Sequence, residues 1–186
     1  MNIITKFSFA TKGGISAHNP YKVNQDAYIT NPHIMGLKHC HFFSVCDGHG
    51  SNGRDVSSFL KHRLPMFIEN HLQTHLKDHD LRKIPPMSKV HPALTSGFAQ
   101  ANYEVCNMGT DVRYSGSTCV SLLTYGRHLF IANVGDSRAI IISQNPADPH
   151  SKCRSLSGSF QFIDVDFVFR VHREGLDEGP QAGRPD

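Results

Sequence analysis

Short apolar segments recur along the first 143 residues, and most of them are bounded by glycine, proline or polar residues. Segments of this length, in which β-branched and aromatic residues are common, are typical of β-strands. The predicted strands cover residues 7–11, 27–30, 41–46, 118–124, 128–134 and 138–143.

Turn residues connect the last three of these strands. Tyr125-Gly126-Arg127 joins the first two, and Gly135-Asp136-Ser137 joins the second and third. Because Gly135-Asp136-Ser137 has the composition of a tight turn, 128–134 and 138–143 are predicted to form an antiparallel hairpin. Residues 118–143 are therefore predicted to be a meander, which argues against a doubly wound parallel sheet.

Two stretches have apolar residues at the spacing of an α-helix. The first follows Ser51-Asn52-Gly53, and Pro65 within it is expected to restart the helix. Its apolar positions are Val56, Phe59, Leu60, Leu64, Phe67, Ile68 and Leu72, and those of the second helix are Leu94, Phe98, Ala101 and Val105. The second helix is predicted to end near Gly109. Residues 77–92 contain charges and three prolines and are predicted to be a loop.

Strands on either side of two amphipathic helices predict an α+β layered sandwich. Residues 144–160 are rich in serine, proline and asparagine and are interpreted as a linker. Alternating apolar residues then predict one strand over 163–171. From Glu174 onward the composition is that of a disordered tail.

Composition and charge narrow the class of protein. A chain of 186 residues fits one domain with its own core. Its net charge of +3 is spread along the sequence without a basic aromatic patch, so no nucleic-acid partner is expected. No apolar run approaches the roughly 20 residues that span a bilayer, so no membrane partner is expected.

The cysteines and the N-terminus indicate a cellular compartment. Five cysteines are an odd number without framework spacing, which suits a reducing environment. The first six residues lack the basic and long apolar parts of a signal peptide. We therefore expect a cytoplasmic protein, with the nucleus as a second location, and leave its oligomeric state open.

The most informative motif is Cys46-Asp47-Gly48-His49-Gly50, which follows an apolar segment. A lone Asp-Gly is usually a turn, but the histidine and second glycine ahead of a helix favour a functional role. Asp26 and Asp136 also stand beside apolar segments. Carboxylate and backbone-carbonyl oxygens without clustered cysteine or histidine favour Mg²⁺ or Mn²⁺ over Zn²⁺. The carbonyl of Gly48 would reach such an ion.

These residue types predict phosphate-ester hydrolysis. Two ions that share an aspartate can activate water and clamp a phosphoryl group. His49, next to the site, would then protonate the leaving oxygen.

Two other clusters are weaker candidates. His71, His75 and His79 follow helical spacing and suit a transition metal, although a solvated helix face is the favoured interpretation. Cys40 and Cys46, which lie near two histidines, lack the second ligand pair of a zinc site.

Four motifs in order resemble those of the type 2C metal-dependent (PPM-type) serine/threonine protein phosphatases. They are Asn24-Gln25-Asp26, Val45-Cys46-Asp47-Gly48-His49-Gly50, Ser115-Gly116-Ser117-Thr118 and Ala132-Asn133-Val134-Gly135-Asp136-Ser137-Arg138-Ala139. Each motif is weak alone, but the ordered set is specific and covers roughly residues 8–143. The resemblance implies a four-layer α-β-β-α sandwich, incomplete in this chain, two Mg²⁺ or Mn²⁺ ions and a phosphoprotein substrate. Residues 1–143 would be a partial phosphatase domain and 144–186 a divergent segment.

The resemblance also implies roles for individual residues. Asp47 would bridge both metals, and the carbonyl of Gly48 would bind one of them. Asp26 would hold its metal largely through water, and His49 would be the general acid. Asp136 would contribute to a weaker, third metal position. Gly116-Ser117-Thr118 would be structural and open a core strand.

Several departures from the family pattern bear on activity. Gln25 stands where many members have glutamate, and Lys22 is the candidate for phosphate binding where the family has arginine. Two later metal aspartates have no matching segment, because the chain lacks tryptophan and any Asp-Asn pair; Asp164 and Asp166 are not assigned as ligands. We therefore expect a metal-dependent phosphatase in a truncated, poorly active form. The alternative is a catalytically inactive, phosphatase-like binding module.

Overall fold

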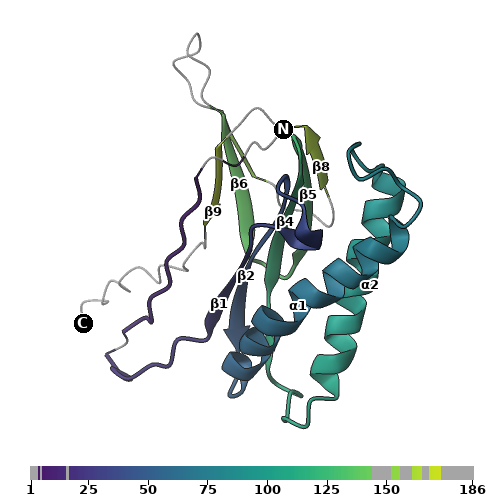
Figure 1. The fold of residues 1–186 in the computed structure, drawn as a ribbon. Coiled ribbons are helices and arrows are strands. Elements are labelled where there is room, and N and C mark those ends of the chain that lie inside the picture. Colours follow the sequence, from purple (N-terminus) through teal and green to yellow (C-terminus); the bar gives the residue numbers. More distant parts are fainter. Residues whose placement is uncertain are drawn as a thin grey trace.

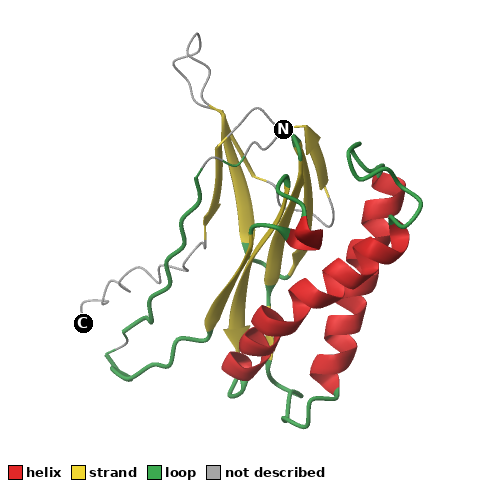
Figure 2. Cartoon of the chain, in the orientation of Figure 1, coloured by secondary structure: helices red, strands yellow, loops and turns green. Residues whose placement is uncertain are grey.

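The computed structural model describes residues 4, 6–15 and 17–143, together with three short strands at 152–155, 161–164 and 168–172. Two long helices lie along one face of a large antiparallel sheet, and a small antiparallel sheet lies on its other side (Figure 1, Figure 2). The predicted α+β class is confirmed. The described residues thus form three layers, and the second helical layer of a four-layer sandwich is not among them.

The large sheet has the strand order β1-β2-β4-β5-β8, and the short β3 pairs with the end of β2. Its strands are β1 (Asp26–Asn31), β2 (Cys40–His49), β3 (Gly116–Ser117), β4 (Cys119–Tyr125), β5 (His128–Val134) and β8 (Gln161–Asp164). The small sheet has the order β7-β6-β9, formed by Lys152–Ser155, Arg138–Ser143 and Val168–His172. Every pairing is antiparallel. Five of the six predicted strands are confirmed to within a few residues at each end.

The helices are α1 (Gly53–His75) and α2 (Met87–Cys106), and a 3-10 turn, η1 (Ile34–Gly36), precedes β2. The predicted loop over 77–92 is wrong in its last part, since α2 begins at Met87 and contains Pro92. Pro92 cannot donate to the carbonyl of Ser88, and its ring crowds that carbonyl. Burial of Val90, Ala93 and Leu94 on that helix outweighs this loss. No described helix is long and apolar enough to cross a membrane.

Two hydrophobic cores lie on opposite faces of the large sheet. The core under the helices contains Phe42, Leu64, Ile68, Leu94 and Leu123 among many others. The core between the two sheets is smaller and consists of Val120, Leu122, Leu129, Ile131, Ala139 and Ile141, with Phe43 and Val45 packed against it. Because each face of β4 contacts a layer, that strand is buried along its whole length.

The predicted hairpin between β5 and β6 is wrong. β5 pairs with β4 and β8, whereas β6 belongs to the small sheet. The connection Gly135-Asp136-Ser137 therefore carries the chain from one sheet to the other. Gly135 has φ +95°, and a Cβ there would lie 2.8 Å from Cγ2 of Thr118. A glycine turn of this composition suits a crossing between sheets as well as a hairpin, so the composition does not distinguish the two connections. The hairpin through Gly126-Arg127 is confirmed, with Tyr125 opposite His128.

The predicted strand over 7–11 is also wrong. This segment makes aromatic contacts in place of backbone pairing: the ring centroid of Phe7 lies 5.1 Å from that of Phe43, and Phe9 stacks on Tyr28 at 4.3 Å. Alternating Phe7 and Phe9 reproduced a strand pattern because alternate residues of this segment contact aromatic side chains of the sheet.

The single strand expected over 163–171 is instead two strands in different sheets. β8 adds to the edge of the large sheet beside β5, and β9 adds to β6 in the small sheet. Period-two alternation indicates a strand but not the edge it pairs with, and each sheet offers an edge. A third strand, β7, lies within the expected linker at 144–160. The expected disordered tail from Glu174 lies outside the described residues.

Candidate functional site

Asp26 and Asp47 lie directly opposite each other on neighbouring strands. They are the first pair in the antiparallel register of β1 and β2, and both are half-buried. The next pair in this register, Ala27 and Cys46, belongs to the core under the helices. Because successive side chains leave opposite faces of a strand, Asp26 and Asp47 project toward the side of the small sheet.

Two carboxylates in opposite positions suit a bound cation. Like charges directly opposite on adjacent strands destabilise a sheet, and a cation between them removes that penalty. Carboxylate and carbonyl oxygens are the ligands that Mg²⁺ and Mn²⁺ prefer, so this donor set fits the expected ions. Within the described part of the chain, no group of three or more acidic, histidine or cysteine side chains is gathered for a metal. The described residues therefore supply part of a metal site.

Gly48 brings the end of β2 into direct contact with the first turn of α1. A Cβ on Gly48 would overlap the carbonyl oxygen of Gly53 and lie 2.6 Å from the carbonyl oxygen of Gln25. Only glycine fits this approach without displacing backbone. The contact sets the carbonyl of Gly48 beside Asp47 and fixes where α1 begins.

Gln25 holds the loop after β2 in place. Its side-chain amide nitrogen donates to the carbonyl of Gly50 at 2.8 Å. Its backbone carbonyl accepts from the amide of Gly48 at 3.2 Å and from the hydroxyl of buried Ser57 at 2.6 Å. The structure therefore gives Gln25, which stands where many members of the family have glutamate, a bracing role.

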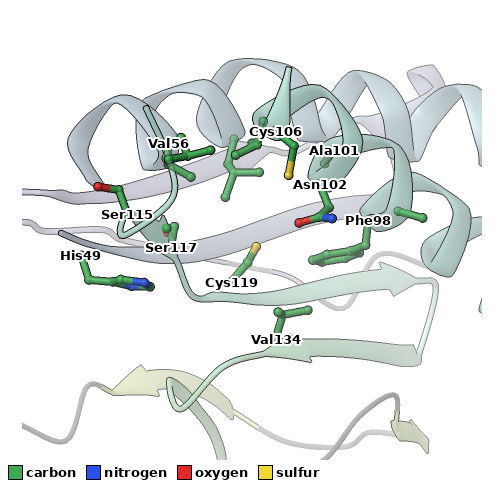
Figure 3. A pocket seen from close by; sticks show the side chains of 15 residues that line it. His49, Val56, Phe98, Ala101, Asn102, Cys106, Ser115, Ser117, Cys119 and Val134 are labelled. Atoms are coloured by element: carbon green, nitrogen blue, oxygen red, sulfur yellow. The ribbon is translucent and has the colours of Figure 1, made fainter. Parts of the chain in front are cut away.

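His49 is the last residue of β2 and is exposed. It stands two residues after Asp47, at the end of the strand where β3 begins to pair with β2. Its ring lies against β3, where a Cβ on Gly116 would be 2.9 Å from Nε2. His49 also lines a cavity of about 540 Å³ between the helices and the start of β4 (Figure 3).

Thr118 ties Asp47 to the turn that contains Asp136. The amide of Thr118 donates to the carbonyl of Asp47 at 2.9 Å, and its Oγ1 accepts from the amide of Asp47 at 3.1 Å. The same Oγ1 lies 2.6 Å from the hydroxyl of Ser137. Asp136 is exposed and follows β5 at this end of the sheet. The turn thus borders the candidate site, while a metal role for Asp136 stays a prediction.

Sequence analysis missed the bracing role of Thr118 and Ser137. Both are small hydroxyl residues next to glycine-containing turns, and that composition is the signal that could have indicated them. Lys22 is exposed in the segment that leads into β1, and its backbone amide donates to Asn19. Its predicted role in phosphate binding stays a prediction.

Two of the three histidines, His71 on α1 and His79 in the turn after it, contact other residues of the protein. Nε2 of His71 lies 3.0 Å from Oε1 of Gln100 on α2, and Nε2 of His79 lies 3.2 Å from the carbonyl of Lys83. These contacts account for His71 and His79 without a transition metal. His71 therefore joins the two helices and is not part of a solvated face.

The fold and the opposed aspartates define a class: α+β sandwich proteins with an oxygen-donor site at the end of adjacent strands. Comparison with known proteins specifies it further. The sequence profile of the family described as Protein phosphatase 2C matches residues 14–158. The chain belongs to the protein phosphatase 2C family. The match extends beyond Ser143, where the resemblance in sequence was expected to stop.

Individual relatives agree with this assignment. Probable protein phosphatase 2C 35 of Arabidopsis thaliana is 33% identical over 135 residues, which are 73% of this chain and 35% of the relative. Probable protein phosphatase 2C 73 of Oryza sativa is 29% identical, over 73% of this chain and 38% of the relative. The chain therefore spans little more than a third of the length of these relatives.

A solved structure supports the fold. The serine-threonine phosphatase 2C from Toxoplasma gondii superposes with a TM-score of 0.55 at 21% identity. The alignment covers 74% of this chain and 46% of that protein. At this identity the likeness concerns the fold alone, and it agrees with an incomplete sandwich.

Proposed function

We propose that this chain carries part of the catalytic site of a metal-dependent protein serine/threonine phosphatase. The observation that carries the proposal is the opposed pair Asp26 and Asp47, with His49 two residues further along the same strand. Family membership supports the reaction class, and the donor set supports Mg²⁺ or Mn²⁺. The proposed substrate is a phosphoserine or phosphothreonine protein.

Each residue has a distinct role in this proposal. Asp26 and Asp47 hold the ions, and the carbonyl of Gly48 supplies a further oxygen. When bound, Mg²⁺ or Mn²⁺ would supply the Lewis acidity that activates water and neutralises phosphoryl charge. His49 donates a proton to the serine or threonine oxygen as the phosphorus–oxygen bond breaks. Asp136 contributes to a weaker third position, and Lys22 attracts phosphate as a point charge.

An incomplete set of metal ligands limits the rate that this chain would reach. The described residues gather two carboxylates and no third acidic, histidine or cysteine side chain for a metal. Ions held by an incomplete ligand set leave the attacking water poorly placed, and misplacement by about 1 Å can lower a rate on the order of 10²-fold. The same observation favours the second candidate, an inactive module that binds phosphoproteins without turnover.

Metal binding tests the role of the aspartates. We expect weak Mn²⁺ binding by titration calorimetry, lost in Asp47→Asn because one of the two opposed carboxylates is removed. Asp78→Asn is the matched control, since Asp78 is exposed in the turn after α1. Equal affinity in Asp47→Asn and the unchanged protein would remove Asp47 from the site.

Turnover separates the two candidate functions. We expect little or no hydrolysis of p-nitrophenyl phosphate or of a phosphothreonine peptide in millimolar Mn²⁺. Robust hydrolysis that disappears in His49→Ala would contradict the inactive module and establish a working enzyme with His49 as general acid.

We further propose a cytoplasmic location, with the nucleus as a second one, and protein partners, with neither nucleic acid nor membrane among them.

A further inference from the structure

A buried cluster of two thiols and two hydroxyls lies beside the candidate site. Sγ of Cys46 on β2 is 3.6 Å from Sγ of Cys119 on β4. The hydroxyl of Ser44 is 3.1 Å from Sγ of Cys119 and 2.8 Å from the hydroxyl of Ser121. None of the roles proposed above uses these thiols.

The backbone geometry at this pair permits a disulfide. Val45 lies opposite Val120, so Cys46 and Cys119 are the next cross-strand pair. The following pair is Asp47 and Thr118. It is hydrogen-bonded, because the amide of Thr118 donates to the carbonyl of Asp47. Hydrogen-bonded and non-hydrogen-bonded pairs alternate, which puts the cysteines at a non-hydrogen-bonded position with Cα atoms about 4.5 Å apart. Disulfides span about 4.4–6.8 Å between Cα atoms.

One of the two thiols can be reached from outside. Cys119 lines the cavity of about 540 Å³, together with His49, Ser117 and Val134. Figure 3 shows the Cys119 sulfur directed toward the α2 residues that form the opposite wall. A cavity of this volume admits a molecule the size of hydrogen peroxide, because a water molecule occupies only about 30 Å³. Cys46 lies behind Cys119 and is fully buried.

The hydrogen bonds within the cluster favour reaction at Cys119. In the contact between the two thiols, Cys46 is the donor and the sulfur of Cys119 is the acceptor. The same bond, with those from Ser121 and Ser44, lowers the pKa of Cys119 against the opposing effect of burial. A sulfur with more thiolate character is the better nucleophile.

We propose that Cys46 and Cys119 form an oxidation site that takes up a peroxide and becomes a cross-strand disulfide. The Cys119 sulfur attacks hydrogen peroxide, so a sulfur–oxygen bond forms, the oxygen–oxygen bond breaks and water leaves. The Cys46 sulfur then attacks the sulfenic sulfur of Cys119, so the sulfur–sulfur bond forms and a second water leaves. Two thiols are oxidised and one peroxide is reduced. The reaction needs neither metal nor phosphatase activity, so it stands apart from the proposed function.

Mass mapping of the whole chain tests the pair directly. The protein, with Cys106→Ser to remove the exposed thiol that also lines the cavity, is treated with hydrogen peroxide and digested without reduction. We expect a crosslinked peptide that joins Cys46 to Cys119, loss of two thiols on counting under denaturing conditions, and recovery of both with dithiothreitol. Cys40→Ala is the matched control, because Cys40 is also a buried cysteine of β2 and should leave the crosslink intact.

Single variants test the order of the steps. Cys46→Ala should accumulate a sulfenic acid at Cys119 that dimedone traps, whereas Cys119→Ala should give none at Cys46. A crosslink between any other two cysteines, sulfinic acid at Cys119 without a crosslink, or full retention of thiols would each overturn the proposal. The mass mapping keeps the native cysteines at positions 46 and 119, so it tests the crosslink even where a single variant fails to fold.

Discussion

The two faces of the large sheet are built from different parts of the chain. The helix face is covered by α1 and α2, which are consecutive in sequence and pack against each other over residues 53–106. The other face is covered by β6 and its neighbours in the small sheet, and by Phe7 and Phe9 near the start of the chain. One face therefore closes through local segments, whereas the face that carries Asp26 and Asp47 depends on segments distant in sequence.

This difference bears on stability and function. Contacts between neighbouring segments form at a low cost in loop entropy, and those between distant segments at a higher one. The helix face has the larger core, which can hold β1 and β2 in register. The face of the aspartates has the smaller core, where cover by other segments can vary with less effect on the fold.

Two neighbouring leucines on β4 give the sharpest test of this comparison. Leu123 is buried under the helices and Leu122 between the sheets. Leu123→Ala should lower the free energy of unfolding by about 4 kcal/mol and Leu122→Ala by about 2 kcal/mol, because the larger core leaves the larger cavity. Urea unfolding measures both. Equal losses would mean that the two faces are equally well packed.

The aromatic residues near the N-terminus give a smaller effect. Phe7 and Phe9 are each about half exposed, yet they contact Phe43 and Tyr28 on the less covered face. Replacing both by alanine should cost about 1 kcal/mol, typical of aromatic pairs, and increase binding of a hydrophobic dye. Tyr103→Ala, at an exposed position on α2, is the control. Unchanged dye binding in the double variant would mean that Phe43 and Tyr28 are shielded by other segments.

The smallest expected effect is a different pH response of the two faces. On the helix face, burial raises the pKa of Tyr125 to about 12, with Cys40 and Asp80 adding to the shift. The folded state therefore holds this proton more tightly, so the contribution to stability is complete below about pH 10 and is lost as pH rises toward 12. On the other face, burial lowers the pKa of His41 despite its hydrogen bond to Pro32. That contribution is complete above about pH 6.5 and declines below it.

Thermal melts across this pH range distinguish the two groups. Tyr125→Phe should flatten the alkaline decline, and His41→Gln should flatten the acidic one. An acidic decline that is unchanged in His41→Gln would assign it to other groups.

Local patterns predicted much of this molecule. Periodicity located α1 and five of the strands. Each of these elements packs one or both faces on a neighbouring layer, and this burial produces a regular spacing of apolar residues. The motif around Asp47 was expected after a strand and ahead of a helix, and β2 continues through it to His49 before α1 begins at Gly53. Gly48 and Gly53 explain why glycine is needed there, since their backbones touch.

The errors arose where pairing partners lie far apart in sequence. Gly135-Asp136-Ser137 was predicted to close a hairpin because its composition is compatible with both a hairpin and a crossing between sheets. The opposition of Asp26 and Asp47 also required the register of two strands, which a single sequence does not specify. The start of α2 was missed because three prolines indicated a loop, whereas burial of Val90, Ala93 and Leu94 outweighs the cost of Pro92 within the helix.

The place of Asp26 at the beginning of β1 has one more consequence. β1 lies at the edge of the large sheet, so its ladder with β2 can fray from this end, where Asp26 faces Asp47. A cation shared by the two carboxylates would stabilise this first residue pair and oppose fraying of β1. Binding of the ion would then slow the exchange of the β1 amide hydrogens with solvent. This effect would be measurable even in a chain that turns over no substrate.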